Sequence, residues 1–395
     1  MNVLPITVAR AAVCIVIGGA IGVAADMRST GRLELDSAVH EQVTPTGLAA
    51  KHTTWRTRTG AVLDVPAAKV VAWGRCPPWP IGPHVLLADG SVIAGTLETF
   101  DGTTAVVRSA TLGRLSLPVK TFAGFRRTAA SQPAAAALEQ GRAAATDPAA
   151  GCFLLLRNGD QLAGRAVMIR DGFAKIVWQD GQVEIPVDSI QSLTFQPVVA
   201  PDAPPMPTLR VALDDGSRFS LTSLGSSEPA VACDPELVVA VAGEGAAVTS
   251  LVAHTPIACE HSTVDPPWPL TRGQTLTGDW PAARGITGFS GLGIHAPARV
   301  RYRLDRPADR FESTVAIDDS AGRGGSVVVR VVAIDRDDER REVYASPVLR
   351  GDEEPLVICA DLAGARELEL VVEPAGNGDR LDRTIWLDPR VVTIE

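Results

Sequence analysis

The sequence lacks the short motifs that mark the common catalytic classes. It contains no G-x-S-x-G nucleophile elbow, no H-E-x-x-H zinc motif, no P-loop and no glycine-rich dinucleotide fingerprint. It also lacks the regular alternation of strands and helices from which a β/α-barrel hydrolase is built. Acidic residues are plentiful, so a pair of carboxylates of the kind that glycosidases use decides nothing by itself. The sequence therefore predicts a protein without enzymatic activity.

Positive charge is scarce and dispersed. The 395 residues include 37 Lys and Arg against 46 Asp and Glu, which gives a formal net charge of -9, and the basic residues do not cluster. This balance disfavours binding to nucleic acid or to an anionic membrane surface. Beyond the first segment no apolar run is long enough to span a bilayer, so no further membrane span is expected.

The first 25 residues predict a secretory signal peptide. Arg10 precedes an almost uninterrupted apolar run from Ala11 to Val23, and Val23 and Ala25 occupy the positions that a signal peptidase reads. The run is shorter than the about 20 residues that a membrane span needs. An uncleaved anchor is the alternative. In both cases the mature chain is expected outside the cytoplasm, as a secreted, periplasmic or cell-surface protein.

Cysteines are few, and their number is odd once Cys14 has left with the signal peptide. No C-x-x-C pair indicates zinc. Cys233 and Cys259 flank one expected strand pair and can form a disulfide if their Cα atoms lie within about 7 Å. Cys359 lies inside an alternating strand and is expected to be a buried free thiol.

The middle of the chain repeats a short β pattern. Residues 85–95 and 154–164 both read as strand, Asp-Gly or Asn-Gly turn, strand and glycine. Each copy continues through a second glycine turn to a segment that ends in proline, at Pro118 and at Pro186. The pattern predicts a small meander of hairpins in each copy.

Two further copies are partial. Residues 55–73 keep only the end of the pattern, whereas residues 209–219 keep its beginning and residues 238–251 are expected to complete it. A unit this short cannot bury its apolar face alone, so the copies should stack or close into small barrels. The layout resembles SH3-like or Sm-like barrels, a similarity of fold that implies no function.

Proline- and alanine-rich stretches divide the chain into segments. The expected order is a signal peptide (1–25), one or more β-meander units including a partial copy (26–127), an Ala-rich linker or short helix (128–150), the second clear unit (151–197), a Pro-rich spacer (198–207), a degenerate third β unit (208–255), a linker (256–266) and a β-sandwich (267–395).

The last third of the chain alternates apolar and polar residues in short runs separated by turn sequences. From Val327 to Ala333 one face is apolar, and the valines on the other face indicate a strand covered on both sides. In the run 367–372 the face that carries Glu367 and Glu369 is expected to meet solvent. Short strands with no helical period between them predict an antiparallel β-sandwich.

This region carries a family resemblance. The residues that carry it are, in chain order, Gly293-Ile294-His295-Ala296, Tyr302-Arg303-Leu304, Arg310-Phe311, Ile317-Asp318-Asp319, Gly325-Ser326-Val327, Tyr344-Ala345-Ser346, Asp361-Leu362-Ala363-Gly364-Ala365, Leu368-Glu369-Leu370-Val371-Val372 and Trp386. Their order and spacing resemble the NPCBM family, the carbohydrate-binding module found beside glycoside hydrolase family 98 domains.

The resemblance implies a galactose-binding-like jelly-roll β-sandwich that serves as an accessory module. Together with the repeats it gives the expected fold class: mainly β, with small SH3/Sm-like barrel units before the sandwich. Two features depart from the family pattern. Thr384 stands where the family has a small residue in the closing Asp-x-Ala-x-Trp run, and Asp335 to Glu342 form a charged insert at a turn that is usually short.

A sugar site needs an aromatic ring for stacking and polar groups that hydrogen-bond hydroxyls. The aromatic candidates are Trp280, Phe289, Tyr302, Tyr344 and Trp386, and the predicted ligand-binding residues are His295, Arg299, Asp319, Tyr344, Asp382 and Trp386. Core packing is the alternative for Trp386. A structural hydrogen bond is the alternative for His295.

Asp318 and Asp319, followed by a glycine-rich loop, are candidate ligands of a structural calcium ion, which galactose-binding-like sandwiches often hold. Calcium needs 6 to 8 oxygen ligands, so other groups would have to contribute. The alternative is a solvated loop in which Asp318 caps its own turn.

The sequence thus predicts an exported, non-catalytic protein that binds a glycan or glycoconjugate through its C-terminal sandwich, with the repeats as a spacer or scaffold. Two alternatives stay open. One is a protein-interaction or surface-assembly protein that contacts other exported or cell-surface proteins and binds no sugar. The other is an accessory subunit of a separately encoded glycoside hydrolase.

Overall fold

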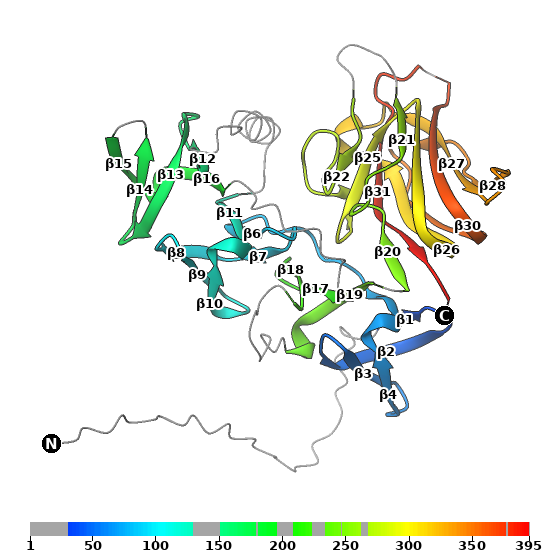
Figure 1. The fold of residues 1–395 in the computed structure, drawn as a ribbon, viewed down its shortest axis with the longest axis horizontal. Helices are drawn as coiled ribbons and strands as arrows, with labels where there is room; N and C mark the ends of the chain where they lie inside the picture. The colour runs from blue at the N-terminus through cyan, green and yellow to red at the C-terminus, as the bar shows by residue number, and fades with distance from the viewer. Residues whose placement is uncertain are drawn as a thin grey trace.

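The computed structural model describes residues 31–128, 151–178, 181–195, 208–222, 234–245, 247–261, 268–376 and 378–394. Within these ranges the chain is mainly β, as predicted, and its helices are five 3-10 turns. The strands form an N-terminal sheet of 19 strands, a C-terminal sheet of 10 and one small hairpin (Figure 1). No helix in this part of the chain is long and apolar enough to cross a membrane. The predicted signal peptide and Pro-rich spacer, and nearly all of the Ala-rich segment, lie outside the described residues.

The N-terminal sheet repeats one unit in which a strand ending in proline is followed by a 3-10 turn and a last strand. The first unit comprises β1 (Gly31–Leu35), β2 (Val39–Leu48), β3 (His52–Thr57), β4 (Val62–Pro66), η1 (Ala67–Lys69) and β5 (Val70–Gly74). The second comprises β6 (His84–Leu87), β7 (Val92–Ala94), β8 (Thr96–Phe100), β9 (Thr104–Ser109), β10 (Gly113–Pro118), η2 (Val119–Thr121) and β11 (Phe122–Arg126).

Two more units follow. The third comprises β12 (Cys152–Leu156), β13 (Gln161–Arg170), β14 (Phe173–Trp178), β15 (Gly181–Pro186), η3 (Val187–Ser189) and β16 (Ile190–Phe195). The described part of the fourth comprises β17 (Thr208–Leu213), β18 (Arg218–Ser220), η4 (Pro235–Leu237) and β19 (Val238–Glu244).

In every unit the last strand returns to pair with the first. The pairs are β5 with β1, β11 with β6, β16 with β12, and β19 with β17, all antiparallel. Proline ends the strand before each turn in the first three units because it has no N–H to donate to a strand ladder. The copy expected to be partial at residues 55–73 therefore extends back to Gly31, since β1 and β2 precede it.

The units also pair with one another through their last strands. β5 pairs with β19, which joins the first unit to the fourth, and β11 pairs with β16, which joins the second to the third. The backbones approach closely at Gly124, where an added Cβ would lie 2.5 Å from the carbonyl oxygen of Leu193. Glycine is needed there because it alone has no Cβ.

The C-terminal sheet folds into the predicted β-sandwich. Its elements are β20 (Val248–Ser250), β21 (Ala258–His261), β22 (Thr271–Arg272), β25 (Gly291–His295), β26 (Ala298–Ile317), η5 (Asp319–Ala321), β27 (Ser326–Ile334), β28 (Arg340–Ala345), β29 (Leu349–Arg350), β30 (Leu356–Pro374) and β31 (Arg383–Val392), with the small hairpin β23 (Ala282–Ala283) and β24 (Ile286–Thr287) inserted. Because β20 pairs with β31 and β21 with β26, the sandwich begins before residue 267, inside the expected third unit and linker.

Two long strands connect the layers of the sandwich. β26 and β30 pair along most of their length, with irregularities between Arg303 and Arg310. On β30 the backbone turns through Ala363 and Gly364, with φ of 47° and 77°, at the same place. Before this bend β26 pairs with β21, and after it β26 pairs with β31.

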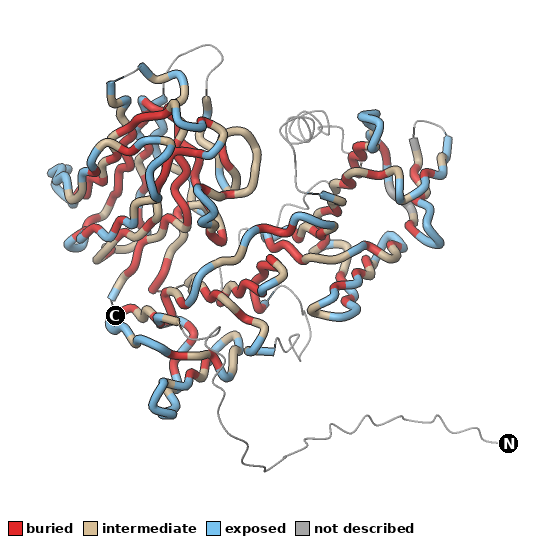
Figure 2. The backbone as a smooth tube through the Cα atoms, turned by 180° about the vertical axis from the view of Figure 1, so that it is seen from behind, coloured by how far each residue is buried: buried red, intermediate tan, exposed pale blue. Residues whose placement is uncertain are grey.

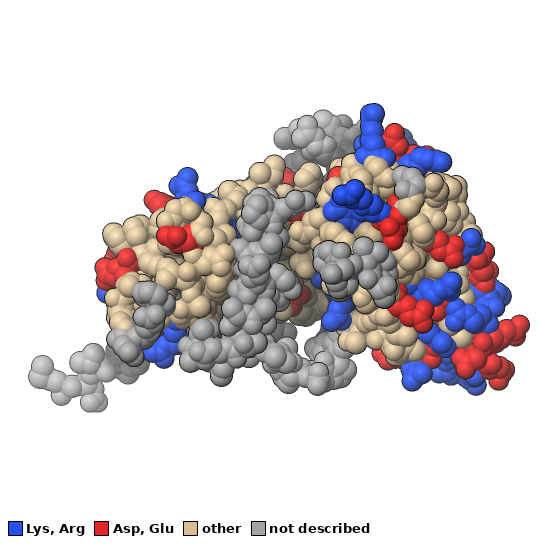
Figure 3. Space-filling view, turned by 90° about the horizontal axis from the view of Figure 1, so that it is seen from above, with Lys and Arg blue, Asp and Glu red and all other residues tan. Residues whose placement is uncertain are grey.

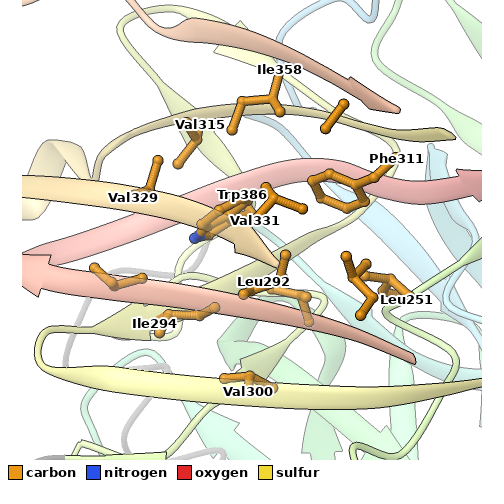
Figure 4. Packing of buried hydrophobic residues seen from close by; sticks show 14 of the residues in the cluster. Leu251, Leu292, Ile294, Val300, Phe311, Val315, Val329, Val331, Ile358 and Trp386 are labelled. Carbon is orange, nitrogen blue, oxygen red and sulfur yellow. The ribbon is translucent and has the colours of Figure 1, made fainter. Parts of the chain in front are cut away.

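Alternate side chains of these strands fill one apolar core (Figures 2 and 4). Trp386, Tyr302 and Phe311 are fully buried, and the rings of Phe311 and Trp386 lie 6.2 Å apart between centroids. The prediction for β27 is confirmed for the face from Val327 to Ala333, which is buried in this core; on the other face Val332 is buried and Val328 is half-buried.

The outer face of β30 corrects one expectation. Glu367 and Glu369 are only 9% and 5% exposed, although alternation predicted that they face solvent. Arginines on neighbouring strands cover them: Arg301 and Arg303 bind Glu367, and Arg299 and Arg340 bind Glu369. Long arginine side chains can cover a sheet face while their charged groups stay near water. Charged residues gather over the sandwich in Figure 3.

The cysteine predictions also need correction. Cys359 is a free thiol but is exposed, because its neighbours Ile358 and Ala360 take the core-facing positions of β30. Cys259 is a free, exposed thiol, so the structure has no disulfide at this residue. Its expected partner, Cys233, lies outside the described residues.

The two sheets contact each other through aromatic and charged side chains. Trp79 and Trp280 stack with ring centroids 4.5 Å apart, and His84 meets the same Trp280 ring edge-on at 5.8 Å. His84 is fully buried and its Nδ1 lies 2.9 Å from the carbonyl oxygen of Gly82. Burial, above all, and the nearby charge of Arg126 lower the pKa of His84 to about 4.

This burial predicts a loss of stability in acid. Between pH 6.5 and pH 4 the unfolded chain binds a proton at His84 that the folded chain does not, so the free energy of unfolding falls as pH decreases. Between pH 7 and pH 4 the free energy of unfolding of His84→Asn should fall by about 3 kcal/mol less than that of the wild type. Urea denaturation at the two pH values measures this difference. Parallel pH profiles for the two proteins would contradict it.

Candidate functional site

One end of the sandwich gathers polar side chains from three adjacent strands. His295 ends β25, Arg383 begins β31, and the two are paired across the sheet. Asp318 directly follows β26, and its backbone N–H donates to the carbonyl oxygen of Arg383. Asp382 precedes β31, and its carbonyl oxygen accepts from the N–H of Ala296. The antiparallel register therefore brings together residues that are almost 90 positions apart in sequence.

An aromatic ring lies beside this group. Trp268 is half-buried and stacks on His295, with ring centroids 5.6 Å apart and planes 8° from parallel. The guanidinium carbon of Arg383 lies 5.4 Å from the centroid of the same indole ring. We call Trp268, His295, Asp318, Asp382 and Arg383 the loop-end cluster.

The two aspartates of the loop-end cluster are buried. Asp318 is 2% exposed, and one carboxylate oxygen accepts from the N–H of Ser320 at 2.8 Å. Asp382 is 1% exposed, and one oxygen accepts from the N–H of Ser326 at 2.7 Å. Burial raises the pKa of both carboxyl groups above their ordinary range, because a charge is poorly solvated there.

Several buried polar atoms of this end have no hydrogen-bond partner among the described residues. They are Nε2 of His295, Oδ2 of Asp318, Oγ of Ser320, Oδ2 of Asp382 and Nε of Arg383. Burying a polar group without a partner costs about 1 to 3 kcal/mol, so such a concentration calls for an explanation. The opposite ring nitrogen of His295, Nδ1, lies 2.6 Å from the carbonyl oxygen of Ala296.

Asp319 lies at the exposed margin of the loop-end cluster. Its two carboxylate oxygens accept from the backbone N–H of Arg284 at 3.0 and 3.1 Å. Among the described residues, no three or more His, Cys, Asp or Glu side chains group together in a way that could hold a metal ion. Asp318 caps its own turn through the N–H of Ser320, as the alternative expected, but its side chain is buried rather than solvated. Calcium at Asp318 and Asp319 stays a prediction that the side-chain geometry does not support.

Three predicted ligand-binding residues lie elsewhere. Trp386 has no exposed surface and packs in the core, so its ring has no face to offer a sugar. Arg299 lies on the outer sheet face and pairs with Glu369 at 3.4 Å. Tyr344 is half-buried on the edge strand β28, and there burial raises the pKa of its hydroxyl.

The remaining aromatic candidates are also internal. Tyr302 and Phe289 are buried, and Trp280 stacks on Trp79 at the contact between the two sheets. The predicted residues that the structure does bring together are His295, Asp382, Asp318 and Asp319. Sequence reasoning missed Trp268 and Arg383. The available signal for Trp268 was a tryptophan within the proline-rich run at the predicted start of the sandwich.

Replacing Trp386 and Trp268 should show which tryptophan packs in the core and which lies at the sandwich end. Trp386→Ala should lower the free energy of unfolding by about 3 to 5 kcal/mol, because it leaves a cavity in a fully packed core. Trp268→Ala serves as the matched variant and should cost less, since that ring is half-buried at the sandwich end. Urea denaturation followed by circular dichroism compares them, and equal losses would be inconsistent with these placements.

The same region of the chain matches a known family. Residues 259–392 match the model of the NPCBM/NEW2 domain. A protein of Renibacterium salmoninarum named "Putative endo-alpha-N-acetylgalactosaminidase" is 30% identical over 111 residues, which are 27% of this chain and 7% of that protein. The chain therefore spans only a small part of this relative.

Two solved structures resemble the chain more distantly. One is the CBM51 module of a GH95 protein from Clostridium perfringens in complex with methyl-galactose, at 21% identity and a TM-score of 0.32, covering 37% of this chain and 99% of that one. The other is the tandem CBM51 modules of a family 98 glycoside hydrolase from Streptococcus pneumoniae, at 11% identity and a TM-score of 0.33, covering 92% and 88%. TM-scores of this size carry no argument, so the assignment rests on the family model. It confirms the predicted resemblance: the C-terminal third of the chain, at residues 259–392, is an NPCBM/NEW2 domain.

Proposed function

We propose that this protein binds a glycan at the loop-end cluster of its C-terminal sandwich and catalyses no reaction. The observation that carries the proposal is the half-buried indole of Trp268, which lies beside His295 and Arg383 in front of buried polar atoms that have no hydrogen-bond partner among the described residues. These atoms are out of contact with solvent, so the proposal requires the loop end to open when a ligand enters. Sugar hydroxyls both donate and accept hydrogen bonds, so one ligand class can then satisfy carboxylate oxygens, an imidazole nitrogen and a guanidinium N–H together.

The aromatic ring supports the same ligand class. Trp268 is held by stacking on His295, so its indole is ordered before a ligand arrives. His295 lies against one face of this half-buried indole, so the apolar surface offered to the C–H face of a sugar is the exposed remainder of the ring. The NPCBM/NEW2 match agrees with the proposal, because the family resemblance implies a carbohydrate-binding module.

The rest of the chain serves as a scaffold in this proposal. Each N-terminal unit closes as a small SH3-like or Sm-like barrel, which the pairing of last strand with first supports. The signal-peptide pattern of residues 1–25 supports export of the chain to a compartment where glycans are exposed. The absence of catalytic motifs from the sequence supports a binding role.

A glycan array probed with the full chain tests this function, with methyl-galactose and N-acetylglucosamine among the sugars, in calcium and in chelator. We expect reproducible binding that Trp268→Ala weakens at least about tenfold, which corresponds to 1.4 kcal/mol. Asp382→Asn should also weaken binding, because an amide cannot reproduce a carboxylate that accepts at both oxygens.

Arg303→Ala is the matched control. Arg303 is 70% exposed and lies near the bend of β26, away from the strand ends that form the loop-end cluster. Binding should be unchanged in this variant. Silence across the array from a folded wild-type chain, or equal losses in Arg303→Ala and Trp268→Ala, would refute the proposal and favour protein partners.

A further inference from the structure

A short segment of the sandwich touches both the N-terminal sheet and the loop-end cluster. We call residues 279–290 the bridging segment. It contains the hairpin β23–β24, in which only two residue pairs are matched. Arg284 and Gly285 form its tight turn, with φ of 53° and 77°. A hairpin of this length is not stable by itself, so its position depends on the contacts at its two sides.

The first side of the bridging segment is fixed to the N-terminal sheet. The indole N–H of Trp79 donates to the carbonyl oxygen of Pro281 at 3.0 Å, and Trp79 stacks on Trp280. The hydroxyl of Thr287 donates to the carbonyl oxygen of Pro77 at 2.7 Å. These contacts join residues about 200 positions apart.

Arg218 completes this contact from β18. It is fully buried, and its guanidinium donates to the carbonyl oxygen of Gly288 and to the hydroxyl of Thr287, each at 2.8 Å, and to the carbonyl oxygen of Pro77. Its guanidinium carbon lies 3.5 Å from the ring centroid of Trp79. Burial lowers the pKa of Arg218 to about 10, so it stays charged at neutral pH. A buried charge depends on its hydrogen bonds, and these reach both sheets.

The second side of the bridging segment is fixed to the sandwich beneath the loop-end cluster. The N–H of Arg284 donates to both carboxylate oxygens of Asp319, the residue after Asp318. The N–H of Ser290 donates to Asp388 at 2.8 Å. Ala283 is fully buried in a small apolar cluster with Ala316, Ile385 and Leu387, which come from β26 and β31.

We infer that Arg218 is a positioning residue for the loop-end cluster: it holds the bridging segment, and through the contact of Arg284 with Asp319 it fixes the strand-end loop that carries Asp318. The inference rests on the proposed function for its effect on glycan affinity. A site whose loop is ordered in advance binds without the cost of ordering it, so the N-terminal sheet sets part of the affinity.

The experiment compares full-length variants at two contacts between the sheets. One contact is made by Arg218 at the bridging segment, and the other by Arg310 at the first N-terminal unit. Arg218→Met removes the guanidinium. Thr287→Val is the milder variant and removes only the hydroxyl between Arg218 and Pro77. Arg310→Met is the matched control, because Arg310 donates to the backbone of Leu35 and Asp36 in the first unit and, within the described part of the chain, makes no hydrogen bond to the bridging segment.

Native-state hydrogen exchange is the first measurement, because it needs no ligand. Exchange at the amides of Arg284 and Ser290 should rise at least about tenfold in Arg218→Met and in Thr287→Val, while the core strands of the sandwich keep their protection. Arg310→Met should leave these two amides unchanged. Arg218→Lys should give an intermediate rise, since lysine keeps the charge without the planar fork.

Glycan affinity is the second measurement. Arg218→Met and Thr287→Val should raise the Kd about five- to tenfold, and Arg310→Met should not. Unchanged exchange in both test variants would overturn the inference, and so would increased exchange with unchanged affinity in a chain that binds glycan. If the wild-type chain binds no glycan, the proposed function fails, and the exchange comparison still decides whether Arg218 positions the segment.

Discussion

The pairing of β31 between β25 and β26 is the constraint on which the C-terminal domain depends. At its start β31 brings Arg383 beside His295 and Asp318. In its middle it inserts Trp386 into the core, and at its end Val392 pairs with Val248 of β20, next to the N-terminal sheet. Because side chains alternate between the two faces of a strand, a shift of the β31 register by one residue would remove Trp386 from the core. The same shift would disperse the loop-end cluster. One strand therefore couples stability, the candidate site and the contact between sheets.

The sequence was sufficient for the parts of this fold that depend on alternation and turns. The strand at Val327 to Ala333 and the two clear repeats were predictable, because the alternation of apolar residues and the glycine turns are local signals in the sequence. The sequence named His295 and Asp382 as candidate sugar ligands and Asp318 as a candidate calcium ligand, and the strand pairing brings all three to one end of the sandwich. Burial of Trp386 was one of two open alternatives, and the structure places the ring in the core.

Other features depended on contacts between distant segments, which no local pattern reports. Glu367 reads as solvent-facing, and only the arginines of β26 bury it. Cys359 reads as buried by its apolar neighbours, yet the phase of β30 turns it outward. Trp268 reads only as part of the proline-rich boundary of the sandwich until its stacking on His295 is seen. In each case the deciding partner lies on another strand, and pairing of strands far apart in sequence is the least local property of a β protein.

We propose that a ligand binds this protein at the loop-end cluster rather than in the core or at the contact between the two sheets. The chain contains seven tryptophans, so its indole N–H groups give a small set of resonances that report on all these places. The most direct measurement is the nitrogen-15 NMR spectrum of these indoles during titration with a bound sugar. The account predicts that the Trp268 resonance shifts and that those of Trp280 and Trp386 do not. A shift at Trp280 or Trp386 with Trp268 unmoved would contradict it.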